Sequence, residues 1–175
     1  MNETLLLLCG ERGGPEHAAR IALDCGEDRG LVLTAIEFDQ EKLSGGRVEE
    51  SRIYGGHEFQ TFDEPVYIGA AIAQLAGHAD VVIVDSLEDW ALRVWRRFPQ
   101  EPVERQAEVL SVLSVIRSRM ARLIFLWLPS TAPASAEQNA WIEEVRRQIS
   151  DCCESIVDLA GEKPRVLKGS LKERM

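Results

Sequence analysis

The 175-residue sequence lacks features that mark several common classes of protein. It has no apolar run near the roughly 20 residues that a transmembrane helix needs, and the apolar stretch at residues 5–9 is too short for a secretion signal. It also lacks a basic excess. The formal net charge of −9 disfavours electrostatic binding to nucleic acid or to an anionic membrane. We therefore expect a cytoplasmic protein that binds neither nucleic acid nor membrane.

Cysteine and histidine are also scarce. The four cysteines, Cys9, Cys25, Cys152 and Cys153, form no Cys-x-x-Cys motif and do not cluster with the three histidines. A thiolate metal site is therefore disfavoured. Cys9 ends an apolar run, and the adjacent pair Cys152 and Cys153 lies near a predicted helix-to-strand junction. Burial in the core is the favoured interpretation of these thiols, and a redox role for the adjacent pair is the alternative.

The order of apolar segments predicts an α/β fold. Short β-rich runs at 5–8, 31–36, 80–85 and 123–128 alternate with stretches of helical periodicity at 18–25, 68–75, 87–91, 103–116 and 136–149. This alternation is typical of a mostly parallel sheet. Two short runs near the end, 155–159 and 165–167, predict an antiparallel closing hairpin. We expect a single domain over residues 1–168, followed by a polar tail at 169–175.

The segment 37–64 fits this alternation poorly. It is polar, acidic and contains glycine, and only residues 59–62 alternate as a short edge strand would. We expect a long loop or a surface excursion over a site. A helix is predicted to begin directly afterwards, because Asp63, Glu64 and Pro65 together resemble a helix start.

The most informative stretch is residues 5–16, where an apolar run ends in a glycine-rich turn. In a phosphate-binding loop, backbone N–H groups surround the phosphates, a Lys neutralises them and a Ser hydroxyl ligates magnesium. The residues after Gly14, where Lys and Ser would stand, are Pro15 and Glu16. Pro15 has no amide hydrogen, and Glu16 puts a carboxylate at a helix N-terminus that would otherwise attract an anion. The turn is therefore either a decayed nucleotide loop or an ordinary β-turn-α junction.

The run at 80–85 also suggests a nucleotide site. Its β-branched residues end on Asp85, as does the strand of P-loop proteins whose Asp holds magnesium. The alternative is that Asp85 caps the next helix. Arg12, the basic residue in the first loop, could grip an anion or pair with a neighbouring glutamate. The nucleotide-binding candidates are Gly10, Arg12, Gly13, Gly14, Thr34 and Asp85, and Asp85 is also the candidate metal ligand.

A series of fragments in a constant order resembles adenosylcobinamide kinase/adenosylcobinamide-phosphate guanylyltransferase, a bifunctional enzyme family of cobalamin biosynthesis. The family's Gly-Ala-Arg-Ser-Gly-Lys-Ser loop corresponds to residues 10–16, and its Val-Asp-Cys-Leu-Thr-x-Trp corresponds to residues 84–90. Weaker similarity to two further family motifs covers residues 33–42 and 47–65. The resemblance implies a three-layer RecA-like P-loop NTPase fold with helices on both faces of the sheet. It also implies GTP or ATP with magnesium as ligand, and a homotrimer or a mixed oligomer with an active paralogue.

The departures from the family fall on the residues that do its chemistry. The loop Lys and Ser are Pro15 and Glu16, the guanylyl-accepting His is Ser51, and the Asn-Glu-Val-Gly after the fourth strand is absent at 127–130. A Ser hydroxyl needs a base and forms a less reactive phosphoester than imidazole does. We therefore expect a non-catalytic homologue with a binding, regulatory or assembly role, and at most weak nucleotide binding. The alternatives are an enzyme with a remodelled site around Arg12, Glu16, Ser51 and Asp85, or a ligand-free protein-interaction domain.

Overall fold

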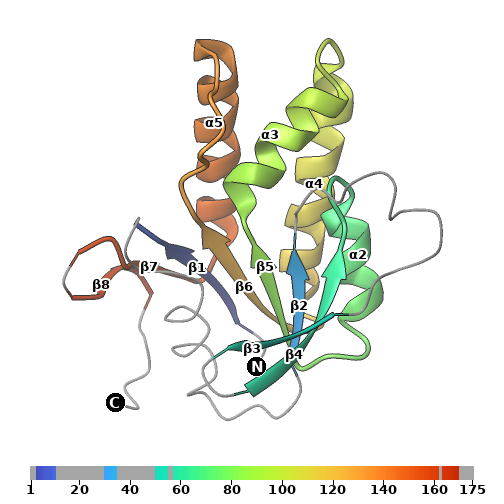
Figure 1. The fold of residues 1–175 in the computed structure, drawn as a ribbon, viewed down its shortest axis with the longest axis vertical. Helices are drawn as coiled ribbons and strands as arrows, with labels where there is room; N and C mark the ends of the chain where they lie inside the picture. Colours follow the sequence, from blue (N-terminus) through green and yellow to red (C-terminus); the bar gives the residue numbers. More distant parts are fainter. Residues whose placement is uncertain (1–2, 11–29, 35–49, 55–56, 162, 170–175) are drawn as a thin grey trace.

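A computed structural model describes residues 3–10, 30–34, 50–54, 57–161 and 163–169, and it shows one mixed sheet with helices along one face (Figure 1). The strands are β1 (Thr4–Leu8), β2 (Gly30–Thr34), β3 (Glu50–Tyr54), β4 (His57–Asp63), β5 (Val81–Asp85), β6 (Arg122–Trp127), β7 (Ser155–Asp158) and β8 (Arg165–Lys168). The helices are α2 (Ile68–Leu75), α3 (Leu87–Arg97), α4 (Pro102–Ser118) and α5 (Ala136–Cys152). None of these helices is long and apolar enough to cross a membrane.

The eight-stranded sheet has the order β3-β4-β2-β5-β6-β1-β7-β8. The six inner strands run parallel, and the outer strands β3 and β8 each pair antiparallel with their inner neighbour. The predicted mostly parallel sheet with an antiparallel closing edge at β7 and β8 is confirmed. A second antiparallel edge, formed by β3 and β4, was not predicted.

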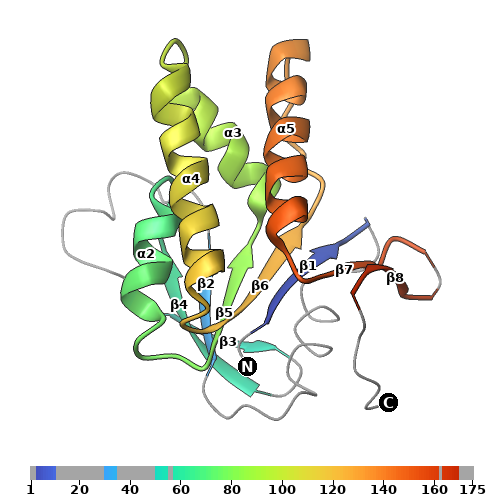
Figure 2. The ribbon, with the colours of Figure 1, turned by 180° about the vertical axis from the view of Figure 1, so that it is seen from behind.

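The described helices all pack on the same side of the sheet (Figure 2). The larger core cluster joins them to alternate strand residues such as Leu6, Val84 and Phe125. The other face of the sheet carries a second buried cluster, which includes Leu7, Ile83 and Leu126, and no described helix contributes to it. The helix predicted at 18–25, which would give the second helical layer, lies outside the described residues.

The prediction of a long loop at 37–64 is wrong for the last part of that segment. Residues 50–54 and 57–63 are strands β3 and β4, and β4 lies between β2 and β3 rather than at the edge. The helix predicted from Asp63 begins later, at Ile68, because Asp63 still belongs to β4. The Glu64 carboxylate instead accepts hydrogen bonds from the N–H groups of Val66 (3.1 Å) and Tyr67 (2.9 Å), and this forms the turn before α2.

The remaining helix starts follow local sequence signals. Ser135 and Gln138 form a reciprocal capping box at the start of α5, as the final Ser of the preceding loop predicts. Pro102 stands in the first turn of α4, where its missing N–H costs no intrahelical bond. The N-cap of α3 is Ser86 and not Asp85, so Asp85 does not occupy the capping position proposed as its alternative role.

Candidate nucleotide site at the carboxyl edge of the sheet

The connections between strands change direction at the carboxyl ends of β1 and β6. From β1 the chain crosses past β6 and β5 to reach β2. From β6 it crosses in the opposite direction, past β1, to reach β7. In open α/β sheets, ligands bind outside the carboxyl ends of the strands where the connections reverse direction in this way. The turn that follows β1, beginning at Cys9 and Gly10, lies at this position.

Three strand ends at the same edge, beyond β6 from this turn, carry polar residues in one row. Thr34 is in register with Asp85 of β5 on one side and with Asp63 of β4 on the other. Neighbouring strands lie about 4.8 Å apart, so these positions span roughly 10 Å of the edge. The structure thus brings the candidates Thr34 and Asp85 together. Asp63 was not predicted as a site residue, although it ends a β-rich run in the way that Asp85 does.

The turn after β1 is held closely against its neighbours. The Cys9 N–H donates to the Trp127 carbonyl (2.9 Å), and the Leu159 N–H donates to the Leu8 carbonyl (2.8 Å). A Cβ at Gly10 would lie 2.9 Å from the Cα of Ala160, which is closer than real Cβ contacts allow. Glycine is therefore required at position 10 by the approach of the turn after β7. This packing role explains Gly10 without any ligand.

Cys9 is a buried thiol within electrostatic range of Asp85. Its side chain is 5% exposed, and burial, followed by the charge of Asp85, raises the pKa of Cys9 to about 11. Burial likewise raises the pKa of Cys153 to about 12. The prediction that these two thiols are core residues is confirmed. Cys9 is a neutral thiol at physiological pH, so it does not supply a nucleophilic thiolate to the site.

This burial predicts a pattern of alkylation. In native protein at pH 8, Cys9 and Cys153 should react with iodoacetamide at least about tenfold more slowly than they do in urea, because the thiolate is the reactive species. Of the three cysteines that the structure describes, the half-buried Cys152 should react first. Asp85→Asn removes the carboxylate that helps to raise the pKa of Cys9, so it should speed labelling of Cys9 at pH 9–10. Mass spectrometry of the labelled peptides measures each rate, and fast labelling of native Cys9 would contradict the buried position.

The segment after β6 is tied to the start of α3. The Glu88 carboxylate accepts from the Trp127 indole N–H (2.9 Å) and from the Ser130 N–H (3.1 Å). Asp89 accepts from the Ser130 hydroxyl (2.6 Å), which in turn accepts from the Ala132 N–H (3.2 Å). The Asn-Glu-Val-Gly motif of the family that the sequence resembles is absent at 127–130, and the structure shows a network of internal hydrogen bonds there. No sequence signal identified Glu88 or Asp89.

The described part of this edge is acidic. The residues that end or directly follow β1, β4, β5 and β6, over 9–10, 63–67, 85–89 and 127–131, include carboxylates but no Lys or Arg. The carboxylates are Asp63, Glu64, Asp85, Glu88 and Asp89. Among the described residues, no three His, Cys, Asp or Glu side chains form a group able to hold a metal ion. The role of Asp85 as a magnesium ligand therefore stays a prediction.

The other predicted site residues are dispersed or lie outside the described residues. Arg12, Gly13, Gly14, Pro15 and Glu16 fall in 11–29, which the structure does not describe. Ser51 pairs with Gln60 of β4, so β4 and β2 both separate it from β5 and Asp85. Three strand spacings correspond to about 14 Å. The backbone positions of Ser51 and Asp85 are thus not adjacent.

Comparison with known proteins identifies the fold. No protein-family model matches the chain, and no curated protein matches it. Among solved structures, a KaiC-like protein from the hyperthermophilic archaeon Pyrococcus horikoshii OT3 is similar over 97% of this chain and 80% of its own, with a TM-score of 0.52 and 18% identity. The chain has a RecA-like P-loop fold. This confirms the predicted fold class, and at such identity the likeness concerns the fold alone.

Proposed function

We propose that this chain is a RecA-like P-loop homologue whose triphosphate site has decayed, and that it acts in the cytoplasm by binding, in a regulatory or assembly role. The observation that carries the proposal is the charge at the carboxyl edge of the sheet. The described residues there are acidic, and the sequence places Pro15 and Glu16 where the phosphate loop needs Lys and Ser.

The magnitude of the electrostatic change supports loss of tight triphosphate binding. Relative to a Lys-Ser pair, Pro15 and Glu16 change the formal charge facing the phosphates by two units. Each unit corresponds to roughly 4 kcal/mol at about 4 Å and an effective dielectric near 20, before solvent screening.

The resemblance to the cobinamide kinase/guanylyltransferase family supports a finer proposal, a role linked to cobalamin biosynthesis. The partner would be further copies of this chain or an active paralogue. A genomic neighbourhood with a complete kinase encoded nearby would favour the partner role. Cobalamin genes without such a kinase would favour retained activity.

A second candidate function is an enzyme of nucleotide or corrinoid metabolism with a remodelled site. The observation that favours it is the row of Thr34, Asp63 and Asp85, which keeps polar positions together where ligands bind in this fold. This row would engage a cation-bearing ligand more readily than a free triphosphate.

Calorimetric titration with ATP and GTP, each with and without magnesium, separates these functions. We expect no measurable binding at low millimolar nucleotide, because the loop offers Pro15 and Glu16 in place of the Lys and Ser that would neutralise the phosphates and hold magnesium. Asp85→Asn is the matched control: it should change nothing in a decayed site, and it should abolish magnesium-dependent binding in a functional one. Micromolar binding by the wild-type protein would overturn the decayed-site proposal.

A further inference from the structure

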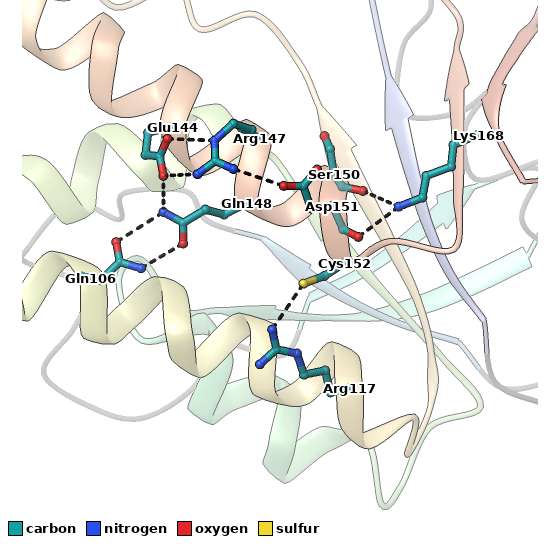
Figure 3. Close-up of polar contacts among 9 residues, drawn as sticks. All are labelled: Gln106, Arg117, Glu144, Arg147, Gln148, Ser150, Asp151, Cys152 and Lys168. Atoms are coloured by element: carbon teal, nitrogen blue, oxygen red, sulfur yellow. Dashed lines mark hydrogen bonds and ion pairs between the residues drawn. The ribbon is translucent and has the colours of Figure 1, made fainter.

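Helix α4 has one side that faces solvent along most of its length. The helix lies between α2 and α5 and stands in front of the helical layer in Figure 2. Its contact with α2 is close, since a Cβ at Gly69 would lie 2.3 Å from the Ser111 hydroxyl oxygen. Its contact with α5 includes the Gln106–Gln148 hydrogen bond (2.9 Å) (Figure 3). The side that points away from α2, α5 and the sheet is left exposed.

This exposed side carries apolar residues at helical spacing. Val103, Ala107 and Leu110 are separated by four and three residues, so they lie in one row along α4. Val103 is 77% exposed and Leu110 is 52% exposed. The small Ala107 stands between the two larger side chains. Rows of this spacing are the ones through which one helix packs against another.

Glutamates border this row. Glu104 and Glu108 lie one turn apart on α4, and neither pairs with a Lys or Arg among the described residues. Partial burial raises the pKa of Glu108, and the nearby charges of Glu64, in the turn before α2, and of Glu104 raise it further. The carboxylates therefore repel one another. We call the following residues the acidic α4 surface: Val103, Glu104, Ala107, Glu108 and Leu110.

The charge of this surface decides what kind of partner can cover it. Two copies of the chain that met through this surface would place like charges against each other, and the net charge of −9 opposes their approach. A Lys or Arg placed beside Glu104 and Glu108 would instead relieve their repulsion and form new ion pairs. The surface therefore favours a basic partner.

The backbone of α4 decides the form of that partner. A helix bonds its own N–H and C=O groups internally, so its side offers none to an added strand. A segment that docks here has to satisfy its own backbone. An amphipathic helix does so, and it presents apolar side chains at the same spacing of three and four residues.

We propose that the acidic α4 surface binds a basic amphipathic helix of another protein. The apolar row of that helix packs on Val103, Ala107 and Leu110, while Lys or Arg residues beside the row face Glu104 and Glu108. This inference names the chemistry of a partner, so it rests on the proposed binding role. It does not require that the triphosphate site be lost.

A synthetic peptide tests the surface. The probe is a fluorescein-labelled peptide of about 18 residues, long enough to form a helix, with Leu in one row and Lys on both sides of it. Fluorescence anisotropy at low ionic strength measures its binding to the full chain. We expect saturable binding that added salt weakens, because exposed charges are screened. Val103→Ser with Leu110→Ser, and separately Glu104→Lys with Glu108→Lys, should each weaken binding at least about tenfold.

Matched controls separate this surface from a general affinity of an acidic protein for a basic peptide. Glu137→Lys with Glu143→Lys makes the same change in net charge on α5, and Val166→Ser with Leu167→Ser removes exposed apolar side chains from β8. Both proteins should bind the peptide as the wild type does. A peptide of the same composition, with its Leu residues spread around the helix, should bind at least about tenfold more weakly. Circular dichroism confirms that each variant is folded.

Several outcomes would overturn the proposal. One is a wild-type protein that does not bind the peptide at about millimolar concentration, and another is an α4 variant that binds as tightly as the two control proteins. If sedimentation velocity shows wild-type self-association that Val103→Ser with Leu110→Ser removes, the occupant is a second copy and the proposal is wrong. The nucleotide titration is independent of these results, so failure of this proposal is distinguishable from failure of the decayed-site proposal.

Discussion

In a protein with Pro15→Lys and Glu16→Ser, magnesium-ATP and magnesium-GTP should bind at least about tenfold more tightly than they bind to the wild-type chain. The substitutions restore the cation that neutralises the phosphates, the hydroxyl that ligates magnesium and an amide hydrogen at position 15. A tenfold gain corresponds to about 1.4 kcal/mol, a small part of the roughly 4 kcal/mol per charge that Coulomb's law gives at about 4 Å before screening. Calorimetric titration of both proteins under the same conditions measures the gain.

Single substitutions serve as controls for this experiment. Pro15→Lys and Glu16→Ser alone should each give part of the effect, and Glu16→Gln should give less than Glu16→Ser because an amide is a poor substitute for the magnesium-binding hydroxyl. If the double variant binds no better than the wild type, the turn after β1 is an ordinary β-turn-α junction. The experiment therefore separates the two interpretations of residues 5–16 that the sequence leaves open.

Trp90→Ala should lower the free energy of unfolding by about 4 kcal/mol, one of the largest single-residue effects we expect in this chain. Trp90 is fully buried in the main core, and its indole N–H donates to the Val66 carbonyl at 2.7 Å. Truncation leaves a cavity between α3 and the sheet and leaves that carbonyl without its donor. Urea denaturation followed by circular dichroism measures the change.

Trp90→Phe separates packing from hydrogen bonding. Phe keeps most of the apolar volume and loses the indole N–H, so it should cost about 1–2 kcal/mol. A Trp90→Ala protein as stable as the wild type would show that this core can close around the missing ring. Because Trp90 belongs to the 84–90 fragment of the family resemblance, a large stability loss would explain its presence by packing rather than by nucleotide chemistry.

The core of the fold was predictable because its signals are local. The run that became β5 is almost entirely β-branched, and the Ser135 capping box marks the start of α5. The strands β3 and β4 were missed or misplaced because their pairing is decided by distant partners. Residues 57–63 gain a place inside the sheet only through β2, and nothing within the segment 37–64 encodes that contact.

The candidate site was predictable only in part, for a related reason. Asp85 was found because it ends a strand with a clear pattern, and Thr34 because the family resemblance covers it. The adjacency of Asp63 follows from register with Thr34, which depends on the order of strands and not on local sequence. The contacts of Glu88 with Trp127 and Ser130 join residues about forty positions apart, as tertiary packing does.

The Glu88 contacts with Trp127 and Ser130 also affect which sequence changes the fold can tolerate. Among the described residues, the segment after β6 is anchored by Glu88 and Asp89, and the turn after β1 is anchored by the Trp127 carbonyl and by its approach to Ala160. Both anchors are internal to the polypeptide. A scaffold supported in this way keeps its shape when selection for a bound ligand is relaxed. We therefore expect substitutions at positions 15 and 16 to leave the fold intact.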